Sequence, residues 1–251
     1  MKRFKEVSLV LSGGAAKGIA HIGVLKALEE LNIKVKRLSG VSAGAIVSVF
    51  YAYGYSPEEM IEILEEINWF KLFKLKAPRL GLIGWERAHE FLKKYIPVER
   101  LEELKKPVSL CAVDLYTGSP LYFSQGELAP ILFGSCAIPG IFEPVKYQDY
   151  LLVDGGIMNN LPVEPCEKFK EPIVCVDVIP ITKQEKVKNM LDILVRSFFL
   201  AVRSNSERRK RRCDFVITPD LSNYTPLDVK KAREIFAIGY KDTLRAFKDI
   251  S

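Results

Sequence analysis

Gly40-Val41-Ser42-Ala43-Gly44 is the stretch of this 251-residue chain that says most about its fold. Residues 33–39 before it alternate apolar and charged side chains, and residues 45–53 after it are mainly apolar up to Gly54. The first pattern predicts a strand and the second a helix. A serine between two glycines at a strand-to-helix turn is exposed as a nucleophile, because so sharp a turn leaves no room for bulky neighbours. The pattern therefore predicts Ser42 as a nucleophile on an α/β fold.

The chain offers few bases that could activate this serine. Its two histidines are His21, which precedes Ser42 among apolar residues, and His89, which lies among charged ones. In α/β-hydrolases the catalytic histidine follows the nucleophile in the chain. The neighbours of His21 indicate a buried helix histidine bonded to backbone, and no carboxylate spacing around His89 suggests a relay. We therefore expect a base other than histidine.

Composition and charge exclude several other classes of protein. With 48% hydrophobic and 27% charged residues and a net charge of +6, the chain resembles an ordinary globular protein with a sizeable core. No nucleic-acid-reading motif is present, so we expect no nucleic-acid partner. The odd cysteine set without a C-x-x-C pair, and the two histidines, argue against a zinc site, and we expect no metal or cofactor. We expect all five cysteines to be reduced thiols, and therefore a cytoplasmic protein. The cysteines are Cys111, Cys136, Cys166, Cys175 and Cys213.

The N-terminus is better interpreted as a first strand than as a signal peptide. After the basic residues 1–5, the apolar run Val7–Leu11 stops at Ser12, short of the roughly 7–15 residues of a signal core. No stretch approaches the roughly 18 apolar residues that a membrane span needs. Any membrane contact would therefore be peripheral.

The rest of the chain alternates strand and helix patterns. This alternation predicts a three-layer α/β fold, with a mainly parallel central sheet, helices on both faces and a helical cap or lid at about residues 56–103. No linker, repeat or low-complexity tract interrupts it, so we expect a single domain over residues 1–251. Strands are expected at Glu6–Leu11, Val35–Ser39, Val108–Leu115, Leu121–Phe123, Leu151–Val153, Ile173–Ile179 and Phe215–Ile217, and further helices at Lys17–Leu31, Val187–Arg212 and Val229–Phe247.

A glycine-rich turn, Ser12-Gly13-Gly14-Ala15-Ala16-Lys17-Gly18, joins the first strand to a helix. Backbone amides at such a turn form an anion site that suits either a phosphate or the oxyanion of an acyl-transfer intermediate. A dinucleotide-binding turn needs G-x-G-x-x-G and an acidic residue about 20 positions later, and a P-loop needs Gly-Lys-Ser/Thr. Neither spacing is present, and together with Ser42 the turn favours an oxyanion site.

Asp154-Gly155-Gly156 is the third element, directly after the apolar residues 150–153. Open α/β sheets place their sites at the C-terminal ends of strands, and the glycines permit a tight turn. Asp-Gly-Gly alone is more often a plain turn. Its occurrence with the other two elements, each at a strand end, favours a shared site.

These residues resemble the patatin-like phospholipases. Residues 13–18 with residues 21–25 are similar to the oxyanion block of that family, residues 40–44 to its nucleophile elbow, and residues 154–156 to its Asp-Gly-Gly block. Residues 135–145 are similar to a further segment of the family. The resemblance is strong from about Val7 to Pro165. It implies hydrolysis of lipid acyl esters by a dyad of Ser42 and Asp154.

The chemistry makes further demands on these residues. An aspartate with the ordinary pKa of about 3.9 is a weak base, so we expect a site largely closed to water, where desolvation raises the pKa of Asp154. The amides of Gly13, Gly14 and Ala15 are the expected oxyanion donors. Many family members carry glycine where this chain has Ala15, and a positive φ there would cost about 1 kcal/mol. Lys17 is expected to meet a carboxylate or solvent rather than substrate.

Two segments leave alternatives open. Residues 68–85 interleave aromatic residues with lysines, which fits a cap packed on the core or a lid that meets acyl chains or a membrane. Residues 207–212 carry five basic residues and one acidic residue, which fits a solvated helix end or attraction to anionic lipid. Peripheral contact with an anionic membrane is therefore the alternative to a purely cytoplasmic location.

Two other functions compete with hydrolysis. A non-catalytic lipid- or acyl-binding regulator of the same fold is the first, although a pure binder has no need of both Ser42 and Asp154. A nucleotide-binding Rossmann-type protein is the second, and the glycine spacing already weakens it.

Overall fold

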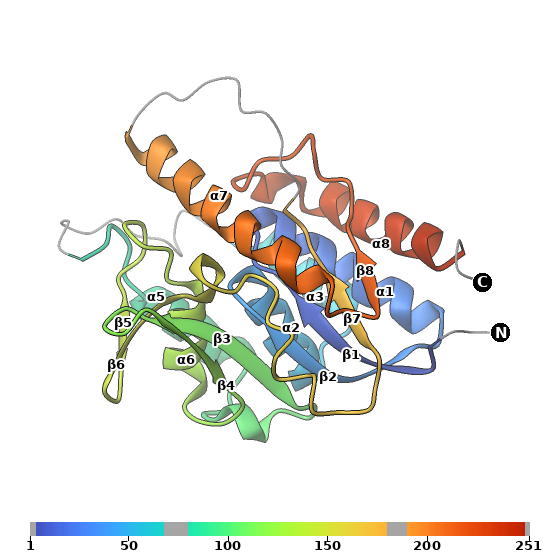
Figure 1. The fold of residues 1–251 in the computed structure, drawn as a ribbon, viewed down its shortest axis with the longest axis horizontal. Helices are drawn as coiled ribbons and strands as arrows, with labels where there is room; N and C mark the ends of the chain where they lie inside the picture. The colour runs from blue at the N-terminus through green and yellow to red at the C-terminus, as the bar shows by residue number, and fades with distance from the viewer. Residues whose placement is uncertain (1–3, 68–79, 180–189, 249–251) are drawn as a thin grey trace.

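The computed structural model describes residues 4–67, 80–179 and 190–248, and shows a central sheet with helices on both faces (Figure 1). The strand order is β5-β6-β3-β2-β1-β7-β8, and β4 pairs with β3 outside this path. The strands are β1 (Glu6–Leu11), β2 (Lys34–Gly40), β3 (Val108–Asp114), β4 (Ser119–Phe123), β5 (Val145–Tyr147), β6 (Tyr150–Asp154), β7 (Ile173–Val176) and β8 (Phe215–Ile217). The α-helices are α1 (Ala20–Glu30), α2 (Ala43–Tyr53), α3 (Pro57–Glu66), α5 (Glu86–Tyr95), α6 (Leu128–Cys136), α7 (Met190–Lys210) and α8 (Ala232–Lys248), and the 3₁₀ turns are η1 (Ala15–Ile19), η2 (Leu101–Glu103), η3 (Gly155–Ile157) and η4 (Val229–Lys231).

The five strands β3, β2, β1, β7 and β8 are parallel, which confirms the mainly parallel sheet. β1 lies near their middle and is buried on both faces. Leu9 and Leu11 belong to the main core, whereas Val10 between them belongs to a smaller cluster with Leu161 and Cys175. Because side chains alternate along a strand, these two clusters lie on opposite faces of the sheet.

The direction of the crossovers explains why helices cover both faces. The chain moves from β1 to β2 to β3 in one direction along the sheet, and from β7 to β8 in the other. Right-handed connections therefore place α1 and α2 on one face and α7 on the other. Figure 1 agrees, with α7 in front of the sheet and α1 and α2 behind it.

The face that carries α1 includes a close helix crossing with α8. Gly23 of α1 lies directly against the backbone of Phe236 and Tyr240, and Gly239 of α8 lies against the backbone of Ala20. A β-carbon at either glycine would collide with main-chain atoms, which cannot move aside as a flexible side chain can. The two glycines therefore fix how closely the C-terminal helix packs on the fold.

The region expected to form a cap contains α3 and α5. Trp85 joins this region to α6. Its ring stacks on Phe133 at 4.9 Å and on Phe142 at 4.8 Å, between ring centroids, and its indole N–H donates to the Glu143 carbonyl at 2.8 Å. The part of the segment just before α5 is therefore attached to α6 and to the loop that follows α6. Residues 68–79, which hold most of the proposed lid, lie outside the described residues.

The expectation of five reduced cysteines is wrong for Cys175 and Cys213, which form a disulfide. Cys175 lies on β7 and Cys213 lies just before the neighbouring strand β8, so their Cα atoms are 6.0 Å apart, a spacing that a disulfide bridges. Sequence spacing could not reveal the pair, because 38 residues separate the two cysteines. Cys111, Cys136 and Cys166 are free thiols.

Candidate active site

Ser42 occupies a strained turn between β2 and α2. Its backbone has φ +53° and ψ −124°, a conformation that non-glycine residues rarely adopt and that is common at functional sites. The flanking glycines have a steric reason. A β-carbon at Gly40 would meet the Gly44 carbonyl oxygen at 2.6 Å, and one at Gly44 would collide with the carbonyls of Leu11 and Ser12. The strand-to-helix turn predicted from the pentapeptide is therefore present.

Residues from the end of α6 hold this strained backbone in place. The Ser42 amide donates to the Ser135 hydroxyl at 3.1 Å, and that hydroxyl donates to the Cys111 carbonyl at 2.6 Å. The Cys136 thiol donates to the Ser42 carbonyl at 3.4 Å. Ser135 is fully buried, so these bonds do not compete with water. The family-like segment that begins at Ser135 thus supports the nucleophile turn.

Strand pairing explains how Asp154 reaches the nucleophile turn. β4 occupies one edge of β3, so β2 and β6 share the other edge, β2 beside Val108–Leu110 and β6 beside Ala112–Asp114. β2 is parallel to β3 and β6 is antiparallel to it, so their C-terminal ends face each other across Cys111. Asp154 therefore approaches Ser42 from an antiparallel strand of the mainly parallel sheet.

The Asp154 carboxyl is buried, with 1% of the residue exposed. Burial raises its pKa from 3.8 to about 7, against the opposing effects of hydrogen bonding from the Ser42 side chain and from the Gly156 amide. Oδ1 accepts a hydrogen bond from the Gly156 amide at 2.8 Å, whereas Oδ2 accepts no hydrogen bond of good geometry from the described residues. Ser42 itself is only 8% exposed. The expected burial and the expected direction of the pKa shift are both confirmed.

The glycine-rich turn lies against the serine. A β-carbon at Gly13 would come within 3.0 Å of the Ser42 Cβ. The Gly13 amide, however, already donates to Asn160 Oδ1 at 3.0 Å. The Gly14 and Ala15 amides have no hydrogen-bond partner in the described part of the chain. Ala15 has φ +49°, so the strain anticipated for alanine at this position is present.

His21 is a structural histidine of this turn, as expected. It is fully buried, and its Nε2 lies 2.8 Å from the Ser12 carbonyl oxygen, with which it forms a hydrogen bond. Burial lowers the pKa of His21 to about 4, which keeps the ring neutral at physiological pH and makes Nε2 the donor. Lys17 is also buried, and desolvation lowers its pKa more than the nearby Asp228 raises it.

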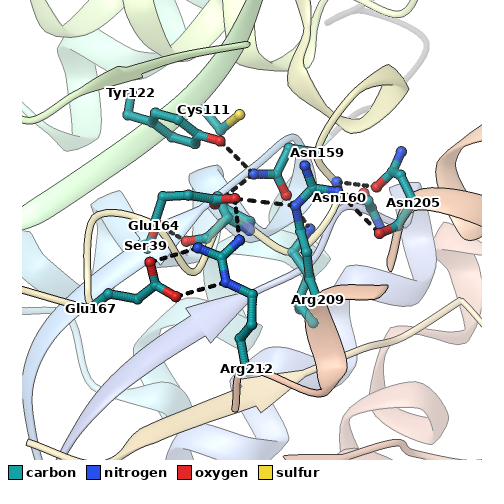
Figure 2. Close-up of polar contacts among 12 residues, drawn as sticks. Ser39, Cys111, Tyr122, Asn159, Asn160, Glu164, Glu167, Asn205, Arg209 and Arg212 are labelled. Carbon is teal, nitrogen blue, oxygen red and sulfur yellow. Dashed lines mark hydrogen bonds and ion pairs between the residues drawn. The ribbon is translucent and has the colours of Figure 1, made fainter. Parts of the chain in front are cut away.

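Three asparagines without a role predicted from the sequence lie around the Asp154 turn, and two of them tie it to α7 (Figure 2). The Asn160 amide donates to Asn205 Oδ1 at 2.8 Å, and Asn205 Nδ2 donates to the Gly156 carbonyl at 2.8 Å. Asn159 Nδ2 donates to the Tyr122 hydroxyl and to Glu164, each at 2.7 Å. The polar pair Asn159-Asn160 between apolar neighbours, five residues after Asp154, was the signal that could have identified them.

The basic run 207–212 is largely neutralised within the chain. Arg209 lies 3.4 Å and Arg212 2.8 Å from Glu164, and Arg212 also pairs with Glu167 at 2.6 Å (Figure 2). Lys210 pairs with Asp177 at 2.7 Å. Figure 2 shows both arginines directed at the loop that follows the Asp154 turn. Arg209 and Arg212 attach the end of α7 to that loop. Three of the five basic residues are therefore paired within the chain, whereas Arg208 and Arg211 are exposed.

The described residues contain no His, Cys, Asp and Glu cluster that could hold a metal ion. Nor does any helix in residues 4–67, 80–179 or 190–248 combine the length and hydrophobicity needed to cross a bilayer.

A strained serine between glycines, next to a buried carboxyl at the end of an α/β sheet strand, is an arrangement typical of serine hydrolases. The chain belongs to the patatin-like phospholipase family, whose pattern matches residues 9–166. This match agrees with the range of the resemblance found in the sequence. Membership of this family supports the interpretation of the chain as a lipid acyl hydrolase.

Individual proteins of the NTE family are similar in sequence to this chain along most of its length. An uncharacterized NTE family protein of Mycobacterium tuberculosis is 27% identical over 255 residues, which cover 90% of this chain and 44% of that protein. Lysophospholipase NTE1 of Scheffersomyces stipitis is 26% identical over 273 residues, which cover 95% of this chain and 18% of that protein. The chain therefore spans less than half the length of these relatives.

Solved structures share the fold at low identity. VipD from Legionella pneumophila superimposes with a TM-score of 0.54 at 17% identity, over 98% of this chain and 67% of VipD. ExoU of Pseudomonas aeruginosa, in its complex with SpcU, gives 0.53 at 13% identity, over 99% of this chain and 53% of the matched chain. At these identities, the likeness concerns the fold.

Proposed function

We propose that this chain hydrolyses lipid acyl esters with Ser42 as nucleophile and Asp154 as general base. The observation that carries the proposal is the burial of Asp154 beside Ser42, which raises the pKa of the carboxyl to about 7. A base is most effective when its pKa lies near the working pH. An aspartate with this pKa can accept the serine proton where an ordinary one would be too weak.

The two half-reactions follow from these groups. Ser42 Oγ attacks the ester carbonyl carbon while its proton passes to Asp154, and the tetrahedral intermediate then releases the alcohol, which takes the proton. A water next gives a proton to Asp154 and attacks the acyl-enzyme. Release of the fatty acid returns the proton to Ser42 Oγ, and both residues regain their starting state.

Gly14 and Ala15 supply the oxyanion donors in this scheme. Their amides are unpartnered in the described residues, whereas the Gly13 amide is bonded to Asn160. Each donor contributes roughly 3 kcal/mol to the transition state. Gly13, the third donor expected from the sequence, contributes directly only if its amide exchanges Asn160 for the oxyanion; otherwise it holds the turn in shape.

The substrate we propose is a phospholipid, a lysophospholipid or a simpler acyl ester, in keeping with a relative named as a lysophospholipase. We further propose that residues 1–251 act as a single domain, with the segment 56–103 covering the site. The cytoplasm is the proposed location, with peripheral contact at a membrane. The Cys175–Cys213 disulfide weighs against the cytoplasm, because disulfides persist mainly in oxidising compartments.

Hydrolysis of p-nitrophenyl butyrate by the purified chain tests the proposal. We expect Ser42→Ala and Asp154→Asn each to lose at least about 10³-fold in kcat. Ser119→Ala and Asp149→Asn make the same chemical changes at exposed positions, and should retain full activity. Activity that survives in either site variant would refute the dyad. Absence of activity in the wild type on every ester tested would favour a lipid-binding regulator.

A further inference from the structure

Helix α7 has an apolar face that points outward. Four of its large apolar residues are strongly exposed: Met190 at 75%, Ile193 at 55%, Leu194 at 48% and Leu200 at 46%. Single exposed apolar residues are normal on protein surfaces, but a contiguous patch marks an interaction site.

The spacing shows that these residues form one face. Positions 190, 193, 194, 197, 200, 201 and 204 recur every three or four residues and are all exposed, and none of the seven side chains carries a charge. The opposite side of the helix packs inward through Val202 and Ser206, which are buried, and through the half-buried pair Phe198 and Phe199. We call the seven outward positions the α7 face.

Helix α7 packs beside the candidate active site, mainly through its inward side, while Leu194 of the α7 face lies at the loop after α6. Leu194 reaches within 3.9 Å of the β-carbon position of Gly140, in the loop after α6, and Val202 lies 3.4 Å from that of Gly156, two residues after Asp154. Asn205 holds the same turn by its bond to the Gly156 carbonyl. In Figure 1, α7 crosses in front of the sheet and its N-terminal half reaches the edge of the molecule.

Charged residues of both signs flank the face on one side. Arg196 and Arg203 are seven residues apart, so they lie on the same side of the helix, beside the positions of Ile193 and Leu200. Glu207 follows on that side, one turn after Arg203. Both arginines are half-buried. The side of the helix that carries the α7 face continues past Ser204 to Arg208 and Arg211, which are both exposed. An uncharged apolar face that ends in cations is the pattern of a helix that lies in the surface of an anionic membrane.

A second copy of the chain fits this surface less well. The four exposed side chains present on the order of a few hundred Å² of apolar surface, below the about 800 Å² per partner of a stable complex. A lipid surface has no such limit, because it is extensive, and its anionic headgroups attract Arg208 and Arg211.

We propose that the α7 face docks on an anionic lipid bilayer, which brings the Ser42 site behind α7 close to the lipid. This inference rests on the proposed lipid substrate for its biological sense, but the docking can be tested without catalysis. It moves the centre of the membrane contact from residues 207–212, where internal ion pairs occupy three of the five cations, to the apolar part of α7.

Flotation of the full chain with vesicles tests the docking. The probes are vesicles of phosphatidylcholine alone and vesicles with about 30% phosphatidylglycerol, at low salt. We expect wild type to float with the anionic vesicles, and Ile193→Ser/Leu200→Ser to lose at least about tenfold in partitioning, because two large apolar side chains no longer enter the lipid. Phe169→Ser is the matched control, since it removes a partly exposed apolar side chain just before β7, at the N-terminal edge of the sheet, and should float like wild type.

Three results would overturn the proposal. They are equal flotation of wild type and the double variant, no flotation of wild type, and equal binding of wild type to both kinds of vesicle. A concentration-dependent dimer that the double variant abolishes would instead assign the face to a second copy. Hydrolysis of the soluble ester p-nitrophenyl butyrate should stay within about twofold of wild type in the double variant. If wild type does not hydrolyse this ester, the proposed function is wrong but the docking proposal is unaffected, because flotation does not depend on hydrolysis.

Discussion

The titration of Asp154 gives a quantitative prediction about stability. Its pKa is 3.8 in an exposed setting and about 7 in the fold, a difference of about three units, or about 4 kcal/mol. The folded protein retains this proton after the unfolded chain has lost it, so stability is highest at acid pH and falls as the pH rises from about 4 to 7. Asp154→Asn removes the titration. The stability of the variant relative to wild type should therefore rise by about 2.5 kcal/mol between pH 5 and pH 8.

Urea denaturation of both proteins across this pH range measures the effect. Asp149→Asn is the control, because this exposed aspartate should leave the pH dependence of stability as in wild type. In parallel, kcat/KM of wild type for a soluble ester should rise with pH through about 7, as Asp154 becomes ionised and able to act as a base. If the difference in unfolding free energy between Asp154→Asn and wild type stays constant from pH 5 to pH 8, the pKa of Asp154 is not raised in the fold.

Other substitutions test the support around the site. Ser135→Ala should reduce kcat at least about tenfold with little change in KM, because the strained Ser42 backbone loses its hydrogen-bond acceptor; an unchanged kcat would show that Ser135 does not position the nucleophile. His21→Ala should lower the free energy of unfolding by about 2 kcal/mol and change kcat only a few-fold, and the reverse pattern would make His21 catalytic. Cys213→Ser should lower stability by roughly 3–4 kcal/mol in urea without reductant, and alkylation of unfolded wild type should find three free thiols before reduction and five after it.

Much of the fold could be predicted from local pattern. The burial of β1 and β7 on both faces gives continuous apolar runs, and the three glycine-containing turns each follow a strand. Helix α6 was missed because its nine residues are apolar almost all round and include Pro130, so they show no helical period. The antiparallel direction of β6 was missed because a short apolar strand does not reveal its pairing partner.

The same limit applies to the candidate site. Ser42 and Asp154 were identified because each belongs to a local motif. Ser135 and Asn160 were not assigned roles, because their partners lie 93 and 147 residues away in the chain. The occupied Gly13 amide is a consequence of Asn160, so the sequence could not distinguish it from the amides of Gly14 and Ala15. Long-range polar contacts of this kind have no periodic signal.

Labelling with a fluorophosphonate probe tests whether Asp154 activates Ser42, because the probe reacts with an activated serine whatever the natural substrate is. We expect one phosphonylated residue, Ser42, identified by mass spectrometry of the digested protein. We also expect loss of labelling in Ser42→Ala and labelling at least about 10²-fold slower in Asp154→Asn. A modified residue other than Ser42, or an equal labelling rate in Asp154→Asn and wild type, would contradict the proposed dyad.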